Sequence, residues 1–199
     1  MNIINILFYM YVFCWITFIV GFIFIKTKTN SAKKLEKLIW NSRVDKFQKK
    51  PFSYVVEWYD KKNYFGLVVL IIILNLTMVI LQSIIGFILI SPIVIAILGF
   101  SAGALIAQAD RKTMIFSLFV LIFELGSFSI SGGIGFYIGA EWIFNKKPFF
   151  EILNQTIIEG YYLIPIVCLI LNGIFEAMGI FFNIEGVPGT KAYKEKIYK

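Results

Sequence analysis

LIFELGSFSISGGIGFYIG, residues 121–139, is the stretch that decides the fold, because it sets a carboxylate, Glu124, among apolar and small residues. The whole chain of 199 residues is 59% hydrophobic and only 16% charged. Soluble domains are typically about 45–50% apolar and about 25% charged. The composition therefore predicts an integral membrane protein, in which most of this stretch faces lipid or other helices.

Apolar runs long enough to cross a bilayer recur along the chain, since one crossing needs about 20 apolar residues. The longest run is divided at Ser91-Pro92, because serine caps helices and proline is accepted in their first turn. The predicted crossings are residues 3–25, 64–89, 92–108, 113–143 and 161–183. The sequence thus predicts an all-α, polytopic transmembrane bundle of about five helices.

The predicted crossings divide the chain into an N-terminal helix (residues 1–25), a basic segment (26–63), a main bundle (64–183) and a basic tail (184–199). The first run has no basic start and no small-residue cleavage site, so we expect a retained helix rather than a signal peptide. One alternative concerns the fourth crossing. A break at Gly132-Gly133 would make it a re-entrant hairpin and move the C terminus outside.

Positive charge is concentrated in residues 26–63, which hold eleven Lys or Arg against four Asp or Glu and so account for the whole net charge of +7. Cytoplasmic segments of membrane proteins are rich in Lys and Arg. The turn at residues 110–112 and the tail at 184–199 are also basic. We expect a protein of the bacterial cytoplasmic membrane with its N terminus outside and its C terminus in the cytoplasm.

Two interpretations of the basic segment stay open. It could be a solvated linker that only sets topology, or an amphipathic helix at the membrane interface with aromatic residues at headgroup depth. The apolar positions at helical spacing are Leu35, Leu38, Ile39, Val44 and Phe47, and the aromatic positions are Trp40, Trp58 and Tyr59. No nucleic-acid partner is expected, because no recognition motif accompanies the lysines.

Four of the five predicted helices carry small or polar residues along one face. In lipid, helices associate through small residues that let backbones approach and through buried polar side chains. The stripes are Asn75, Gln82 and Gly86; Ala96, Gly99, Gly103 and Ala107; Glu124, Ser127, Ser131, Gly135 and Gly139; and Asn172, Glu176, Gly179 and Asn183. We expect these faces to turn inward. The GxxxG pair formed by Gly99 and Gly103 could pack within the chain or form a homo-oligomer.

Two glutamates in these stripes are the leading candidates for function. A charged side chain at the membrane centre costs about 2.5–3.5 kcal/mol on insertion scales, so Glu124 and Glu176 need a reason to be there. One interpretation is structural: they hydrogen-bond to Asn75, Gln82 or Asn172 and fix the helix register. The other is that these five residues line a proton or cation path.

Histidine is absent from the sequence, and both cysteines, Cys14 and Cys168, lie in apolar runs. The absence of histidine argues against the usual zinc hydrolases and Ser-His-Asp triads. The cysteines are typical of small buried hydrophobic residues rather than of a disulfide or a metal pair. We therefore expect a protein that is not an enzyme and has no cofactor and no metal site.

Two similar tetrapeptides occur in the last two predicted helices, and each contains one of the glutamates. Together with several small residues they resemble the stage II sporulation protein M family, over residues 64–183. The matching positions are Ile122-Phe123-Glu124-Leu125, Ile174-Phe175-Glu176-Ala177, Asn75, Gly86, Leu98-Gly99, Gly103, Gly132, Gly133, Gly135 and Gly139. The His-Gly pair that precedes the Glu-Leu of the family is replaced here by Val120 and Leu121.

The resemblance implies a membrane scaffold, since the sporulation member of the family is understood to recruit cell-wall hydrolases without being one. We therefore expect a non-enzymatic integral membrane scaffold or an accessory subunit of a membrane complex. The alternative is a small transporter or exporter subunit whose buried glutamates line a proton or cation path. The expected partners are the lipid bilayer and membrane or envelope proteins, with an ATPase or a second copy of the chain as candidates.

Overall fold

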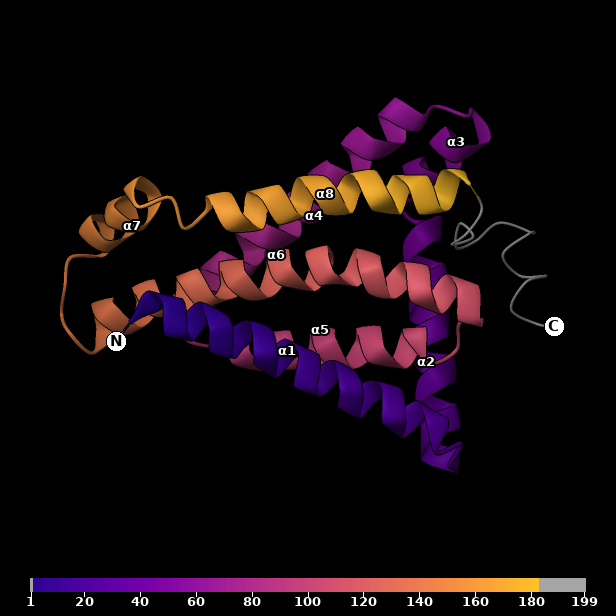
Figure 1. Ribbon diagram of the computed structural model, residues 1–199, viewed down its shortest axis with the longest axis horizontal. Coiled ribbons are helices and arrows are strands. Elements are labelled where there is room, and N and C mark those ends of the chain that lie inside the picture. The colour runs from indigo at the N-terminus through magenta and orange to yellow at the C-terminus, as the bar shows by residue number, and fades with distance from the viewer. Residues whose placement is uncertain (1, 183–199) are drawn as a thin grey trace.

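The computed structural model describes residues 2–182, apart from the side chains of residues 40, 43, 44, 46 and 47. Within this part every regular element is an α-helix, so the all-α prediction is confirmed (Figure 1). The helices are α1 (Ile3–Lys26), α2 (Asn30–Gln48), α3 (Ser53–Asp60), α4 (Tyr64–Phe87), α5 (Ser91–Ile106), α6 (Arg111–Ile143), α7 (Phe149–Ile158) and α8 (Leu163–Phe181). Asn183 and the predicted basic tail lie outside the described residues.

The five predicted crossings correspond to α1, α4, α5, α6 and α8. Four of them, α1, α4, α6 and α8, are long and apolar enough to cross a membrane, whereas α5 is a shorter apolar helix of 16 residues. These helices make the chain a membrane protein. Because α6 runs unbroken through Gly132-Gly133, the alternative of a re-entrant hairpin is wrong.

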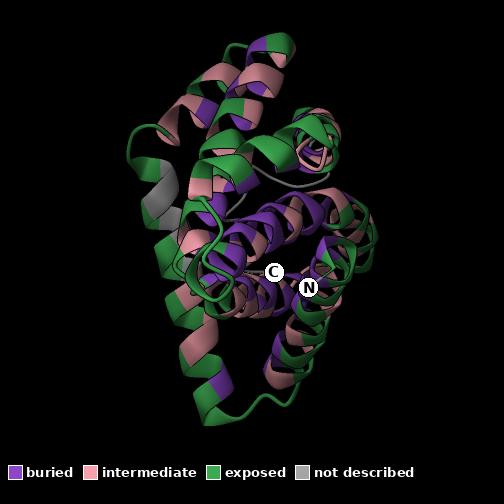
Figure 2. Cartoon of the chain, turned by 90° about the vertical axis from the view of Figure 1, so that its left-hand side faces the viewer, coloured by how far each residue is buried: buried purple, intermediate pink, exposed green. Residues whose placement is uncertain are grey.

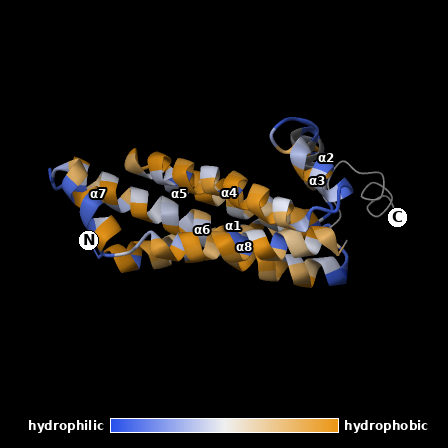
Figure 3. Ribbon diagram, turned by 90° about the horizontal axis from the view of Figure 1, so that it is seen from above, coloured by the Kyte–Doolittle hydropathy of each residue, from blue (hydrophilic) through white to orange (hydrophobic). Residues whose placement is uncertain are grey.

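The five apolar helices lie side by side and run back and forth, with α6 in the middle (Figure 1). α6 contacts α1, α4, α5, α7 and α8. The N terminus and α7 lie at one end of this bundle, which we call the α7 end. α2 and α3 lie at the opposite end, which we call the α2 end. Buried residues face the space between the helices (Figure 2), and hydrophobic residues predominate along the bundle while hydrophilic ones gather at its ends (Figure 3).

Side-chain caps set the start of four helices, and at α2 the Thr29 Oγ1 accepts the main-chain N–H of Ala32. Asn2 accepts a hydrogen bond from the main-chain N–H of Ile4, Asn63 caps α4 in the same way, and the Asp110 carboxylate accepts the N–H groups of Lys112 and Thr113. These bonds satisfy N–H groups that have no partner inside the helix.

The division of the long apolar run at Ser91-Pro92 is correct, but the expected role of Ser91 is wrong. Ile90 occupies the cap position of α5 and makes no side-chain capping bond, and the proline lies in the first turn. Ser91 belongs to the helix itself, is fully buried, and its Oγ has no hydrogen-bond partner in residues 2–182. The hydroxyl is therefore directed into the bundle rather than toward the end of its own helix.

α2 lies across the α2 end of the bundle, at a steep angle to the five apolar helices (Figures 1 and 3). Ala32, Leu35 and Ile39 pack against the ends of α1 and α5, whereas Leu38 is 66% exposed. The apolar face of this helix is thus used, at least in its first half, to cover the bundle. The side chains of the predicted positions Trp40, Val44 and Phe47 lie outside the described part of the chain.

Trp58 and Tyr59, which one of the two interpretations of the basic segment places at headgroup depth, pack against a buried cluster between α3, α4 and α8 that includes Val55 and Leu67. Both aromatic side chains are only half-buried, so their outer edges still reach the surface of the α2 end.

Candidate functional site

The glycine stripe of α5 packs against α1 within the same chain. A Cβ atom built on Gly99 would overlap the main-chain oxygen of Cys14, and one on Gly103 would overlap that of Phe18. Gly21 of α1 has the same relation to the main-chain oxygen of Phe100. Only the absence of a side chain lets two helices come this close. The GxxxG pair is therefore occupied by an intramolecular contact.

The stripe of α6 packs against α4 in a second close contact. Gly135 and Gly139 meet the main chain of Ser83 and Phe87, and Gly86 meets the main chain of α6 in return. The Ser131 Oγ donates a hydrogen bond to the main-chain oxygen of Val79 at 3.0 Å, and Ser83 Oγ donates to the main-chain oxygen of Ser131 at 3.3 Å. Ser127 is also buried, and its Oγ bonds to the Glu124 carbonyl inside its own helix. Small residues and reciprocal hydrogen bonds thus join α4 to α6.

α8 contacts α6 through Gly179 of its stripe, which lies against the Phe116 ring, and through the neighbouring Phe175, whose ring centroid is 4.8 Å from that of Phe119. Asn172 is fully buried, and its Nδ2 donates to Glu176 Oε2 at 3.5 Å, one turn along the same helix. The Asn172 Oδ1 has no hydrogen-bond partner in the described residues. Glu176 therefore shares an intrahelical polar pair with Asn172.

The two glutamates lie beside one aromatic contact between α6 and α8. Phe119 is beside Phe175, and Gly126 beside Cys168, so α6 and α8 run antiparallel. The Phe175 ring also stacks on the Phe123 ring at 5.7 Å, and Glu176 and Glu124 directly follow these two phenylalanines in the sequence. Both glutamates are half-buried.

The amides of α4 differ from one another in their surroundings. Asn75 is half-buried, with an Nδ2 atom that has no partner in the described residues. Gln82 is fully buried and lies opposite Gly132, eight residues along α6 from Glu124, or about 12 Å. Gln82 is therefore separated from Glu124 along the length of the bundle. Within residues 2–182, no three Cys, Asp or Glu side chains come together in a way that could hold a metal ion.

An ion pair at the α7 end was missed by the sequence reasoning, which treated the lysines and glutamates of residues 145–160 only as a charge balance. Glu141 is 3% exposed, accepts a hydrogen bond from Asn145 Nδ2 at 2.9 Å, and pairs through Oε2 with Lys147 Nζ at 2.6 Å. The sequence contains a signal for this ion pair, since Glu141, near the end of a predicted helix, is followed six residues later by Lys147. The hydrogen bond and charge of Glu141 raise the pKa of Lys147 above its ordinary value of 10.5.

Replacing Lys147 by methionine is expected to lower the melting temperature of the detergent-solubilised protein by a few degrees at neutral pH, because the buried Glu141 carboxylate then loses its ion pair with Lys147. A raised pKa in the folded state means that the stabilisation is complete below pH 10.5 and is lost as the pH rises through the folded pKa. The difference from wild type should therefore shrink at pH values above 10.5. Lys146→Met is the matched control, because Lys146 is exposed and makes no ion pair in the described structure. Equal melting temperatures for the two variants would contradict a stabilising role of the ion pair.

No family model, curated protein or solved structure matches this chain. The resemblance to the stage II sporulation protein M family therefore stays a hypothesis based on the residues alone, and the class of protein defined by fold and site is a helical membrane bundle.

Proposed function

We propose that this protein is a non-enzymatic membrane scaffold, or an accessory subunit of a membrane complex, that holds an acidic partner protein at its α2 end. The observation that carries the proposal is the orientation of α2. Its apolar residues Ala32, Leu35 and Ile39 pack on the bundle, while Lys33, Lys34 and Lys37 are exposed on other sides of the helix. A basic surface is thereby held on a rigid support and directed away from the bundle.

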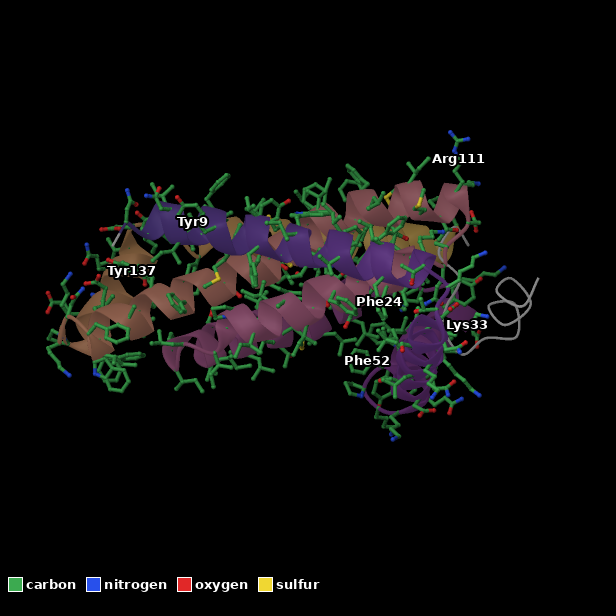
Figure 4. The ribbon with its side chains drawn as sticks, turned by 90° about the horizontal axis from the view of Figure 1, so that it is seen from below. Tyr9, Phe24, Lys33, Phe52, Arg111 and Tyr137 are labelled. Atoms are coloured by element: carbon green, nitrogen blue, oxygen red, sulfur yellow. The ribbon has the colours of Figure 1, made fainter. Side chains whose placement is uncertain are left out.

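The lysines of this surface are available to a partner. Lys33, Lys34 and Lys37 form no ion pair in the described residues, in contrast to Lys61, whose Nζ lies 2.5 Å from Glu57 Oε1. Residues 26–63 and 110–112 together carry thirteen Lys or Arg against five Asp or Glu. Figure 4 shows Lys33 and Arg111 at this same end of the molecule. Such a concentration of one charge attracts and orients acidic partners.

The same charge distribution supports an orientation with the α2 end in the cytoplasm. The segment at the α7 end, residues 144–162, holds only two Lys and two Glu. By the positive-inside rule the α2 end is then cytoplasmic and the N terminus outside. The sequence resemblance to a family with a scaffolding member agrees with this proposal.

Transport is the second candidate, and it is favoured by the Asn172 and Glu176 pair. The Asn172 Oδ1 is buried without a hydrogen-bond partner in the described residues, next to an ionisable side chain within an apolar helix. Polar and ionisable groups inside membrane helices commonly mark ion or proton pathways.

The scaffold proposal is tested by changing the charge of α2. The triple variant carries Lys33→Gln, Lys34→Gln and Lys37→Gln. The amount of acidic protein that co-purifies with it from native membranes should be at least about tenfold lower than for wild type, because long-range attraction and direct ion pairs are both removed. Lys61→Gln, at the same end but already paired with Glu57, is the matched control and should keep the partner. The opposing outcome is measured in liposomes. If the wild-type protein supports a proton or cation flux, and Glu124→Gln or Glu176→Gln abolishes this flux, the scaffold proposal is wrong and the protein is a transporter.

A further inference from the structure

α7 is too short to cross a membrane, and its connections hold it close to two helices that can. Its ten residues correspond to about 15 Å, whereas one crossing needs about 20 residues. Five residues join it to α6 and four residues join it to α8, and both of these helices are candidate membrane spans. Such short connections keep α7 within roughly 20 Å of the ends of both spans. α7 accordingly lies at one end of the bundle (Figure 1).

One side of α7 packs on the bundle. Ile152 is 3% exposed and Thr156 is 1% exposed, and Phe149 precedes Ile152 by one turn. Residues spaced by three and four lie on the same side of a helix. Ile152 and Phe149 pack in a cluster with Leu7 of α1 and Ile138 of α6. This contact leaves the other two sides of α7 free of the bundle.

The two free sides differ in polarity. Phe150 is 79% exposed and Ile157 is 55% exposed, and their spacing of seven residues places them on one side of the helix. The third side carries exposed polar residues at intervals of four, namely Glu151, Gln155 and Glu159. Ile158, which is also exposed, lies between these two sides. α7 therefore presents one side to protein, one that suits an apolar medium and one that suits water.

The exposed apolar side of α7 continues the outer surface of a spanning helix. Trp142, near the end of α6, is 47% exposed, and its ring centroid is 5.7 Å from that of Phe149. The Phe149 ring centroid is in turn 5.5 Å from that of Phe150. Tryptophan is enriched where a membrane helix reaches the membrane–water interface. A row of contacting aromatic rings thus leads from the lipid-facing surface of α6 to the apolar side of α7.

We infer that α7 is an interfacial helix that lies in the bilayer surface at the α7 end, with Phe150 and Ile157 among the lipid chains and its polar side in water. Helices of this kind bury their apolar side about 5–10 Å into the boundary between headgroups and acyl chains. Lipid is favoured over a protein partner, because the apolar side is continuous with a surface that lipid already covers. This membrane contact is separate from the proposed scaffold function, which resides at the opposite end, and it fixes the depth of the α7 end in the membrane.

The test uses spin labels on the full chain, reconstituted into vesicles of phosphatidylcholine and phosphatidylglycerol. Cys14→Ala and Cys168→Ala remove the native thiols, and single cysteines are then introduced by Ile157→Cys on the apolar side or Gln155→Cys on the polar side. Collisions are measured with oxygen, which concentrates in the bilayer, and with a water-soluble nickel chelate. The label from Ile157→Cys should collide severalfold less with nickel than the label from Gln155→Cys. Its depth below the phosphates should be about 5–10 Å.

Val167→Cys provides the lipid reference, because Val167 is 54% exposed on the spanning helix α8. Equal nickel collision rates for Ile157→Cys and Gln155→Cys would overturn the inference, because both sides of α7 would then be in water. An immobilised label at position 157 that neither oxygen nor nickel reaches would overturn it as well, and it would show that a protein covers this side. Phe150→Cys, on the same side of α7, decides the matter where Ile157→Cys fails to fold.

Discussion

Gly103→Ala is expected to destabilise the protein by about 2–3 kcal/mol, the upper part of the usual range for overpacked cores. The new methyl group would overlap the main-chain oxygen of Phe18 on α1, and a main-chain atom moves only if the whole helix moves. The gain in helix propensity from replacing glycine by alanine, about 1 kcal/mol, offsets only part of this cost. Unfolding in detergent, followed by circular dichroism, measures the effect.

Gly126→Ala provides the comparison, because its methyl group would make only ordinary contacts, the nearest at 3.6 Å. It should be neutral or slightly stabilising. The same pair of variants separates the two interpretations of the GxxxG motif. If Gly99 and Gly103 served a homo-oligomer, Gly103→Ala would change the mass measured by light scattering and leave the unfolding transition of the protomer in place.

Gly135→Ala should have a comparable effect at the second close contact, about 2–3 kcal/mol. Its methyl group would overlap the main-chain oxygen of Ser83, and separating α4 from α6 would also lengthen the bonds from Ser131 to Val79 and from Ser83 to Ser131. Such interhelical hydrogen bonds in membranes contribute about 0.6 kcal/mol each on average. Unfolding in a graded series of denaturing detergent measures the loss.

Gly133→Ala, two residues away on α6, tests whether any methyl group added to this helix destabilises the protein or only one at the contact with α4. Its methyl group would first meet Leu7 Cδ2 at 3.0 Å, the far end of a side chain that can rotate away. A smaller loss than for Gly135→Ala is therefore expected. Equal losses for the two variants would show that the close approach of α4 and α6 does not determine stability.

The candidate site could be predicted only in part. The pairing of Asn172 with Glu176 follows from their spacing of four residues on one helix, which places side chains on the same face. The inward stripe of α4 predicts that Gln82 lies near the glutamates, yet its neighbours are Ser91 and Gly132. The position of a residue on a stripe predicts that its side chain faces inward. It does not predict which residues of the other helices lie beside that side chain.

The sequence by itself determined the number and extent of the apolar helices, because hydropathy over a run of residues depends on the side chains of that run alone. It also determined which face of four of these helices turns inward, since helical periodicity places small and polar residues on one side. Both properties are local, and both can be read along the chain without knowledge of the fold.

Only the tertiary structure decided which stripe meets which helix. α5 packs against α1, with a Cys14 thiol directed to the Ile95 carbonyl 81 residues away, and α6 packs against α4. The structure likewise turned the apolar side of α2 onto the bundle and covered Glu141 beside Lys147. The physical reason is that close packing depends on the shapes of two surfaces at once, and neither surface is specified by the residues of the other.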